Sequence, residues 1–457
     1  MYILSVVNAI RYISTNRQRP GGDPAAVSFA EALERGLAPD GGLYLPERLP
    51  RLTPDDLERL RGASYAEIAD YVLWPFVEDC GIGRAAFRSL CADAYDFEVP
   101  LEAYEEGVWL LRLDRGPTAS FKDFAARWMA RMMAALRPPG RRRTVLVATS
   151  GDTGSAVGEA FRGLEGFRVF LLYPAAEVSR IQKFQLDHIG DNVTALSVDG
   201  TFDLCQSLVK EAFLDPRLAG HGLTSANSIN IGRILPQAVY YVYAWLRTAR
   251  AGEPVTFSVP SGNFGNSFGC ELARRMGLPV ARLILAVNAN DEFPRFLATG
   301  RYEPLSPSRA CLSNAMNVGN PSNLARYFDW YGGRLTREGR VERAPDLDAM
   351  RARLESVSVD DAATVERIRR AWHERGVLLE PHGAVGVEAL ERAGRGREVA
   401  ICLETAHPAK FPEVMERELG FAPLQPPSFE RLGGRTAAVE PLAPDYEALH
   451  RRLAREP

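Results

Sequence analysis

Lysine is almost absent from this chain of 457 residues. Among its 55 lysine and arginine residues, only Lys122, Lys183, Lys210 and Lys410 are lysines. Arginine cannot replace lysine in every reaction, because a guanidinium does not form an ordinary imine with an aldehyde, whereas an uncharged primary amine does. Each lysine is therefore a candidate for that chemistry, although a solvent-exposed position without function is the simpler interpretation of a lysine taken at random.

Several other patterns are absent as well. The six cysteines are irregularly spaced with no C-x-x-C, and the six histidines form no H-x-x-x-H pair, which argues against a disulfide framework and a metal site. The net charge of -3 argues against a nucleic-acid partner. No apolar run approaches the ~20 residues that span a bilayer, and the first residues lack the pattern of a signal peptide. We expect a cytoplasmic protein with reduced thiols and no membrane contact.

Short β-rich segments alternate with helical ones over most of the chain. The predicted strands lie at 144–148, 168–173, 192–198, 255–259, 282–287 and 399–404. Because strands joined by helical crossovers run parallel, this order predicts an α/β architecture with a largely parallel sheet. Residues 20–95 are predicted to form mostly helices and loops, and Thr53 before Pro54 suits a helix start. We expect an N-terminal domain over residues 1–95 and a catalytic region over 96–457, in which the loop-rich segment 305–365 covers one edge.

Two glycine-rich loops follow predicted strands and differ in charge. The segment "SGDTG" contains Asp152, whose carboxylate would repel a phosphate, whereas "SGNFGN" is uncharged. Helix N-termini beyond the carboxyl ends of parallel strands present free N–H groups to anions, and glycine lets the backbone approach closely. We therefore predict a phosphate at Gly262–Asn266 and a less anionic group beside Asp152. A strand-to-helix turn that uses glycine only for its geometry explains either loop alone.

The choice of phosphate compound follows from what the motifs exclude. No G-x-x-x-x-G-K-[ST] motif is present. The segment "GDTGSAVG" departs from the dinucleotide fingerprint, because its glycines are spaced G-x-x-G and no acidic residue ends the next strand. A nicotinamide cofactor stays open as an alternative. Pyridoxal phosphate needs both an amine and a phosphate-binding loop, and Lys122 directly precedes a helical run. Helix polarity and burial would lower the pKa of its amine and favour the reactive, uncharged form.

The order of motifs along the chain resembles that of the threonine synthase family, in the longer kind found in bacteria and fungi. The matching segments cover nearly the whole chain and are "YIST", "SFAEALERGLAPDGGLYLPE", "GPTASFKDF", "ATSGDTG", "SANSINIGR", "PSGNFGN", "SNAMNVGNPSN", "EPHGAVG" and "TAHPAKF". The resemblance implies a fold type II pyridoxal-phosphate enzyme, similar to the β subunit of tryptophan synthase. Such a fold has two open parallel-sheet lobes with the cofactor in the cleft, and here a small, mostly helical N-terminal domain is added.

The resemblance also implies roles for individual residues. Lys122 would bind the cofactor covalently and then shuttle protons at the substrate's carbons. The other cofactor-binding residues would be Asp152 near the ring hydroxyl, Thr405 at the pyridine nitrogen, and Gly262, Asn263, Phe264, Gly265 and Asn266 at the phosphate. The substrate would contact Ser150, Thr153, Asn227, Ser228 and Arg233. A salt bridge at the surface or an interface is the alternative for Arg233, and a helix N-cap is an additional role for Thr405.

The implied activity is that of a carbon–oxygen lyase acting on phosphates, which converts O-phospho-L-homoserine and water to L-threonine and phosphate. We expect no metal, and a monomer or a homodimer. A relative that eliminates phosphate without adding water, or that acts on a phosphonate analogue, stays open, and so does a nicotinamide-dependent oxidoreductase.

Two departures from the family's usual pattern leave room for an altered substrate. Asp114 and Arg115 stand where Phe-His is often found before "GPT". Asn16 and Arg17 follow Thr15 where an arginine alone is common.

Overall fold

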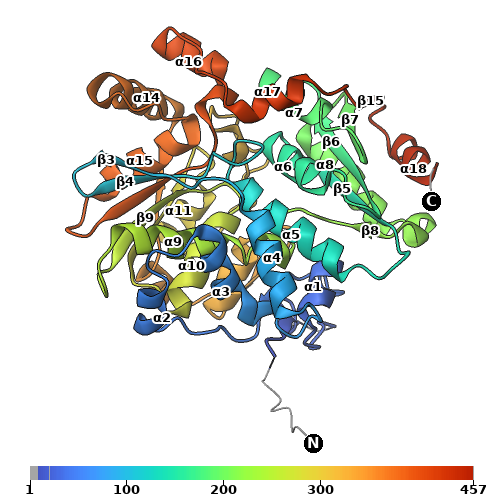
Figure 1. Cartoon of the computed structure of the whole chain (residues 1–457), viewed down its shortest axis with the longest axis horizontal. Helices are drawn as coiled ribbons and strands as arrows, with labels where there is room; N and C mark the ends of the chain where they lie inside the picture. Colours follow the sequence, from blue (N-terminus) through green and yellow to red (C-terminus); the bar gives the residue numbers. More distant parts are fainter. Residues whose placement is uncertain (1–8, 20, 456–457) are drawn as a thin grey trace, which may run out of the picture.

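Two largely parallel sheets form the centres of two lobes (Figure 1). The computed structural model describes residues 9–19 and 21–455. Within these residues no helix is both long enough and apolar enough to cross a membrane. Each of the six predicted strands lies in one of the two sheets, so the α/β prediction is confirmed.

The first sheet contains five parallel strands in the order β15-β7-β6-β5-β8. These strands are β5 (Arg143–Ala148), β6 (Phe167–Pro174), β7 (Val193–Val198), β8 (Leu223–Thr224) and β15 (Val439–Leu442). The helices around them are α5 (Lys122–Leu136), α6 (Asp152–Phe161), α7 (Arg180–Asp187), α8 (Phe202–Leu214) and α18 (Tyr446–Ala454). The apolar runs of β5 and β6 are almost wholly buried, as expected for parallel strands that helices cover.

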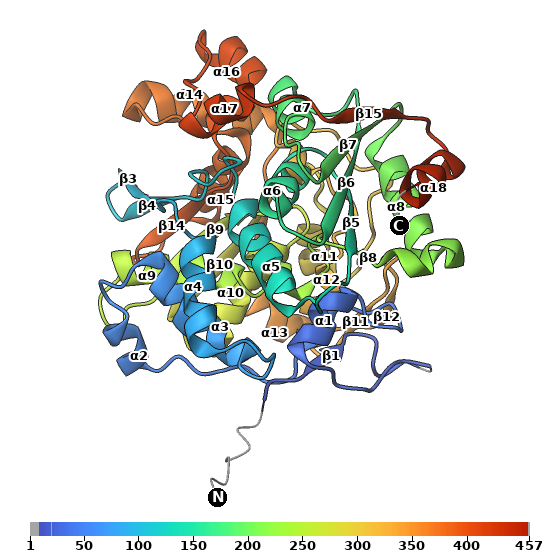
Figure 2. The same cartoon turned by 45° about the vertical axis from the view of Figure 1, so that its right-hand side comes forward.

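The second sheet has six strands in the order β13-β10-β9-β14-β4-β3, of which only β3 runs antiparallel to its neighbour. The strands are β3 (Leu101–Glu105), β4 (Val108–Arg112), β9 (Val255–Pro260), β10 (Val280–Val287), β13 (Glu355–Ser358) and β14 (Ala400–Glu404). The helices of this lobe include α9 (Gln237–Thr248), α10 (Gly265–Met276), α11 (Glu292–Thr299), α14 (Asp361–Arg375), α15 (Pro381–Ala393) and α16 (Pro412–Leu419), whereas α17 (Pro427–Gly433) packs against α7 of the first lobe. Figure 2 shows the two sheets as separate layers, with α5 and α6 between them.

The segment 305–365 differs from the prediction in one respect. It was expected to cover an edge, but it also supplies the edge strand itself, because β13 pairs in parallel with β10. Its other elements are α12 (Leu324–Trp330), the antiparallel pair β11 (Arg334–Leu335) and β12 (Val341–Arg343), and α13 (Leu347–Arg351). Short 3-10 helices occur at η1 (Pro216–His221), η2 (Ile231–Arg233), η3 (Asn314–Met316) and η4 (Pro408–Lys410).

The N-terminal part consists of helices and loops, as predicted from the sequence, and adds one small ladder. Its elements are β1 (Tyr12–Ser14), β2 (Tyr44–Pro46), α1 (Phe29–Arg35), α2 (Pro54–Arg59), α3 (Tyr65–Val77) and α4 (Arg84–Ala94). Thr53 caps α2 in a capping box with Asp56, which confirms the predicted helix start. Gly62, with φ of +88°, then interrupts the helical spacing, and Ser64 starts α3 with a second capping box. We keep the domain boundary after residue 95 as a proposal.

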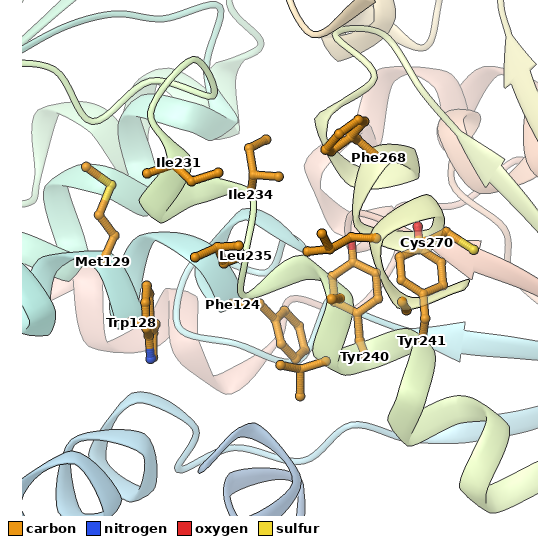
Figure 3. Packing of buried hydrophobic residues seen from close by; sticks show 14 of the residues in the cluster. Phe124, Trp128, Met129, Ile231, Ile234, Leu235, Tyr240, Tyr241, Phe268 and Cys270 are labelled. Carbon is orange, nitrogen blue, oxygen red and sulfur yellow. The ribbon is translucent and has the colours of Figure 1, made fainter. Parts of the chain in front are cut away.

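Aromatic side chains join the N-terminal part to the catalytic region and fix helix α5. The ring of Phe124 lies 5.2 Å from that of Tyr65 and 5.8 Å from that of Tyr240, and Trp128 lies 5.8 Å from Phe29. Figure 3 shows the catalytic side of this core, where Phe124 of α5 lies beside Tyr240 of α9 and Met129 lies beside Ile231 of η2. Full burial of each such ring contributes roughly 2–3 kcal/mol. This packing holds the first residue of α5, Lys122, in a fixed position.

Candidate active site

The carboxyl ends of four strands deliver the candidate residues to one region. Strand β4 leads to Lys122, β5 leads to Asp152, β9 leads to the loop Gly262–Asn266, and β14 ends just before Thr405. Because neighbouring parallel strands end at the same edge of a sheet, such loops meet where an α/β fold binds its ligands. The structure therefore brings most of the predicted site together.

The loop before Lys122 folds around the side chain of Asp123. The Asp123 carboxylate accepts hydrogen bonds from the Thr118 N–H at 2.8 Å and the Thr118 hydroxyl at 2.7 Å. Gly116 approaches this carboxylate so closely that a Cβ there would lie 2.5 Å from Asp123 Oδ2. The segment "GPTASFKDF" thus requires its glycine, threonine and aspartate for local geometry.

A short antiparallel bridge joins the lysine loop to the segment after β14. The Phe121 N–H donates to the Thr405 carbonyl at 2.9 Å, and the His407 N–H donates to the Ala119 carbonyl at 3.0 Å. Ala119 has φ of +56°, a conformation that is uncommon for a residue with a side chain. Lys122 and Thr405 are therefore held in a fixed relation by backbone hydrogen bonds.

Two lysines contact the carboxylate of Asp152. The Lys410 Nζ lies 2.6 Å from Asp152 Oδ1, and the Lys122 Nζ lies 3.7 Å from Oδ2. Gln182 also donates to Oδ1, at 3.1 Å. Burial alone would raise the pKa of Asp152, but the ammonium groups of Lys410 and Lys122 outweigh burial and lower that pKa. Asp152 is therefore an anion with a lysine at each oxygen.

The amine of Lys122 is suited to act as a nucleophile. Only 13% of its side chain is exposed. Burial lowers the pKa of Lys122, the Asp152 carboxylate opposes this effect, and the charges of Lys410 and Arg233 add to the lowering. A lowered pKa increases the share of uncharged amine, which is the form that attacks an aldehyde.

Thr405 contacts a buried acidic residue that the sequence interpretation did not single out. Its hydroxyl donates to Glu380 Oε1 at 3.3 Å, and Glu380 Oε2 accepts from His382 Nδ1 at 2.6 Å. The Ala315 N–H donates to His382 Nε2 at 3.1 Å, so the ring is held with its proton on Nδ1. The N-cap of η4 is His407, and thus the additional N-cap role expected for Thr405 is wrong.

The glycine-rich loop after β9 ends in a strained residue at the start of a helix. Phe264 has φ of +58° and precedes α10, whose first N–H groups have no acceptor within the helix. The Asn266 side chain is occupied by the loop itself, because it donates to the Pro260 carbonyl at 2.8 Å and accepts from Ser261 Oγ at 2.9 Å. A Cβ on Gly262 would lie 2.7 Å from the Cα of Met316. Gly262 is therefore required for packing against a neighbouring loop.

The loop "SGDTG" also uses its glycines for geometry. Gly151 has φ of +130°, and a Cβ on Gly154 would lie 2.4 Å from Thr149 Cγ2. The Thr149 hydroxyl accepts from the N–H groups of both glycines, at 3.0 and 2.8 Å. Ser150 and Thr153 are partly buried beside Asp152.

The segment "SANSINIGR" lies against the glycine-rich loop. Asn263 donates to Ser228 Oγ at 2.5 Å, which joins the two segments directly. Arg233 is 4% exposed, and one Nη donates to the Ala226 carbonyl at 2.8 Å, whereas its Nε has no hydrogen-bond partner. The Oδ1 of Asn227 is also buried without a partner. Burial lowers the pKa of Arg233 to about 10, so its guanidinium is charged at neutral pH.

Arg233 has no carboxylate in contact anywhere in residues 9–19 and 21–455. A surface salt bridge, one of the two forms of the alternative for this residue, is therefore wrong for the described chain: Arg233 is buried and forms no ion pair there. A buried cation with an unsatisfied donor matches a site for an anion.

A second buried arginine, Arg326, was not predicted. It lies behind the segment 227–230, donating to the Ile229 carbonyl at 2.7 Å and the Tyr44 carbonyl at 3.0 Å, and it also bonds to the side chain of Asn323. Burial lowers the pKa of Arg326 to about 9. No sequence signal distinguishes it from the other arginines, because its partners are backbone carbonyls from distant segments.

The departures from the family pattern lie beside the site. Asp114 is buried in an ion pair with Arg112, whose Nη lies 2.6 Å from Oδ2, whereas Arg115 is 37% exposed and 3.5 Å from Glu102. Arg17 bonds to Asp329 at 2.7 Å. None of these residues contacts Lys122, Asp152 or Arg233 in an ion pair or hydrogen bond that the structure records.

The residues present fit pyridoxal phosphate. An amine with a lowered pKa, a helix start with free N–H groups and a hydroxyl beyond a third strand occur in one region. No group of three or more metal-ligating side chains occurs among the described residues, which gives a metal no alternative site there. Fold and site together define a pyridoxal-phosphate-dependent enzyme of the two-lobed class.

Comparisons with known proteins identify the family within that class. Residues 97–402 match the model for pyridoxal-phosphate-dependent enzymes, residues 11–95 that for the threonine synthase N terminus, and residues 383–452 that for the threonine synthase C-terminal region. The threonine synthase of Pseudomonas aeruginosa is 40% identical, covering 91% of this chain and 92% of that protein. The pyridoxal-phosphate-bound threonine synthase of Brucella melitensis superposes with a TM-score of 0.91 at 36% identity, over 97% of this chain and 99% of that one. The yeast enzyme superposes with a TM-score of 0.87 at 30% identity, over 98% of each chain. The chain belongs to the threonine synthase family, and its cofactor is pyridoxal phosphate.

Proposed function

We propose that the enzyme converts O-phospho-L-homoserine and water to L-threonine and phosphate, as a carbon–oxygen lyase acting on phosphates. The observation that carries this substrate is Arg233, a buried guanidinium without a carboxylate partner in the described residues and with a free Nε. Its planar fork can pair two phosphate oxygens at once. Ser228 and the carboxamide of Asn227 lie on the same segment and can donate to the same anion.

The cofactor's sites are proposed on the same basis. We assign the aldehyde carbon to Lys122, the phosphate to Gly262, Asn263, Phe264, Gly265 and Asn266, the ring hydroxyl to Asp152 and the pyridine nitrogen to Thr405. When bound, pyridoxal phosphate supplies an electron sink for the carbanions formed at the substrate's α- and β-carbons.

The protein's own residues move the protons and hold the leaving group. With its amine free, Lys122 would take the proton from the α-carbon, pass that proton to the cofactor's electron sink, and then, uncharged again, take a proton from the β-carbon. Arg233 stabilises the γ-phosphate as it leaves, while Ser150 and Thr153 orient the substrate beside Asp152. Lys122 would then give its proton to the γ-carbon and, as the free amine, assist water in adding at the β-carbon. Burial of the site keeps bulk water from competing before phosphate has left.

We also infer the cellular location and the oligomeric state. All six cysteines are unpaired, which favours a reducing, cytoplasmic location. We expect a monomer or a homodimer, which size-exclusion chromatography with light scattering distinguishes.

The activity is tested by identifying products. Purified protein with pyridoxal phosphate is incubated with O-phospho-L-homoserine, and L-threonine and phosphate should appear in equal amounts. Lys122→Ala should form neither. Lys183→Ala is the matched control, because Lys183 is 43% exposed and pairs with Asp187 away from Asp152. Phosphate with a 2-oxo acid in place of L-threonine would indicate a phospholyase, and intact substrate with the cofactor bound would refute the proposal.

A further inference from the structure

Lys410 is the second lysine near Asp152, and its side chain is completely buried. Besides the Asp152 carboxylate, its Nζ contacts the Thr118 carbonyl at 3.0 Å. That carbonyl belongs to the same loop as Lys122 and also accepts from the Gln185 side chain at 3.1 Å. A buried ammonium is retained only where it is paired and hydrogen-bonded, so the position of Lys410 needs an explanation.

The charges that face Lys122 come from four elements and are of both signs. Asp152 at the start of α6 and Glu380 at the N-cap of α15 favour its charged form, whereas Lys410 in η4 and Arg233 in η2 oppose it. Asp152 itself is faced by Lys122, Lys410 and His382. The state of Lys122 therefore depends on which cation Asp152 pairs with.

The distances show that Asp152 pairs with Lys410. The Lys410 ammonium is 2.6 Å from its carboxylate oxygen, which is hydrogen-bond distance, whereas Lys122 is 3.7 Å from the other oxygen and makes no hydrogen bond to it in the structure. Without Lys410, Lys122 would be the nearest cation to a buried carboxylate. An opposite charge within about 4–6 Å stabilises an ammonium and would keep Lys122 protonated.

We propose that Lys410 is a positioning residue for Lys122: it neutralises Asp152, so that the Lys122 amine is uncharged and free to attack when the cofactor's aldehyde arrives. The inference rests on the proposed role of Lys122. In the step concerned, the neutral Nζ forms a bond to the aldehyde carbon, and the two amine hydrogens leave with the carbonyl oxygen as water. An ammonium has no electron pair for this attack.

The test measures the state of Lys122 without using catalysis. Full-length protein from which the cofactor has been removed is labelled with trace acetic anhydride at a series of pH values, and the acetylation of Lys122 is followed by peptide mass spectrometry. Lys410→Met should raise the pKa of Lys122 by about one unit or more, which leaves about tenfold less uncharged amine at pH 7. The rate of colour formation with added pyridoxal phosphate should fall by the same factor and recover at higher pH.

A double variant separates charge from structure. In Lys410→Met/Asp152→Asn both charges are removed, so the labelling profile of Lys122 should return toward that of the unmodified protein. Lys183→Met should change nothing. If Lys410→Met fails to fold, Asp152→Asn alone still tests the inference. Loss of the carboxylate should shift the pH dependence of Lys122 acetylation to lower pH.

Each outcome has a distinct meaning. An unchanged Lys122 profile in Lys410→Met, no recovery in the double variant, or an unshifted profile in Asp152→Asn would overturn the inference while leaving the proposed function intact. Borohydride reduction followed by peptide mapping tests the underlying assignment. A cofactor adduct on Lys410 in place of Lys122 would overturn both.

Discussion

Replacing Arg233 with alanine tests the proposed binding of the substrate's phosphate. The guanidinium is 4% exposed and forms no ion pair within the described residues, so in the substrate complex its charge would be compensated by the phosphate. Truncating one partner of such a buried charge pair costs about 2–5 kcal/mol. At 1.36 kcal/mol for each tenfold change, kcat/KM for O-phospho-L-homoserine should fall by about 30-fold to 5,000-fold.

The assay compares three variants and two substrates. Arg233→Lys keeps the charge but loses the planar fork of the guanidinium. Its kcat/KM for O-phospho-L-homoserine should lie between those of the wild type and Arg233→Ala. Arg115→Ala is the matched control, because that arginine is 37% exposed and pairs weakly with Glu102. The visible spectrum of the bound cofactor should be the same in all of them. The loss should be smaller in a slow side reaction of L-threonine, which carries no phosphate.

The result that would refute this reasoning is an equal loss with both substrates. Arg233 would then support the fold, since its Nη also donates to the Ala226 carbonyl.

Two further predictions follow from the structure. Gly262→Val should lose bound cofactor on dialysis, because its Cβ would lie 2.7 Å from the Met316 backbone. Gly265→Ala should retain more cofactor, since the nearest neighbours of its Cβ are 3.3 Å away. Equal retention in the two variants, measured as visible absorbance, would contradict this prediction. Burial raises the pKa of Glu292 from 4.5 to about 8, so the folded carboxyl is neutral, and unfolding releases a proton between these values. The free energy of unfolding therefore falls as the pH rises from 4.5, by at most about 3 kcal/mol at pH 7. Glu292→Gln should abolish this dependence on pH, which denaturant titrations at pH 5 and pH 8 measure.

The sequence predicted the parts of the site that depend on local pattern. The strands before Asp152 and before the loop Gly262–Asn266 are short apolar runs with polar, glycine-containing segments directly after them, so both loops could be found from strand ends and glycines. Lys122 was found because lysine is rare and because a helical run follows it, and the strand that leads to it, β4, was not predicted. Edge strand β13 was missed because "ESVS" is short, half-buried and contains a single apolar residue.

Residues whose role comes from distant contacts could not be predicted in the same way. Lys410 follows β14, and Asp152 follows β5 in the other sheet, so nothing near either residue signals their ion pair. Arg326 contacts the carbonyls of Tyr44 and Ile229. Because every residue has a backbone carbonyl, the sequence does not indicate which ones an arginine will contact. The sequence interpretation explained the glycines by close approach of the backbone to a ligand. The structure adds a second reason, because Gly262 and Gly154 also pack closely against protein atoms.

The two proposed phosphate sites differ in charge, and this difference suits their tasks. The cofactor's phosphate would stay bound through every turnover, and in the proposed site neutral N–H groups at the start of α10 would hold it without a side-chain cation in the loop. The substrate's phosphate must be stabilised as it leaves, which calls for the directed charge of Arg233. The Asn263–Ser228 hydrogen bond of 2.5 Å joins the two loops, so an anion bound at the first loop would also help to fix the segment proposed to bind the substrate's phosphate. Loss of that bond in Asn263→Ala should therefore weaken substrate binding as well as cofactor retention, whereas Arg233→Ala should affect only the substrate.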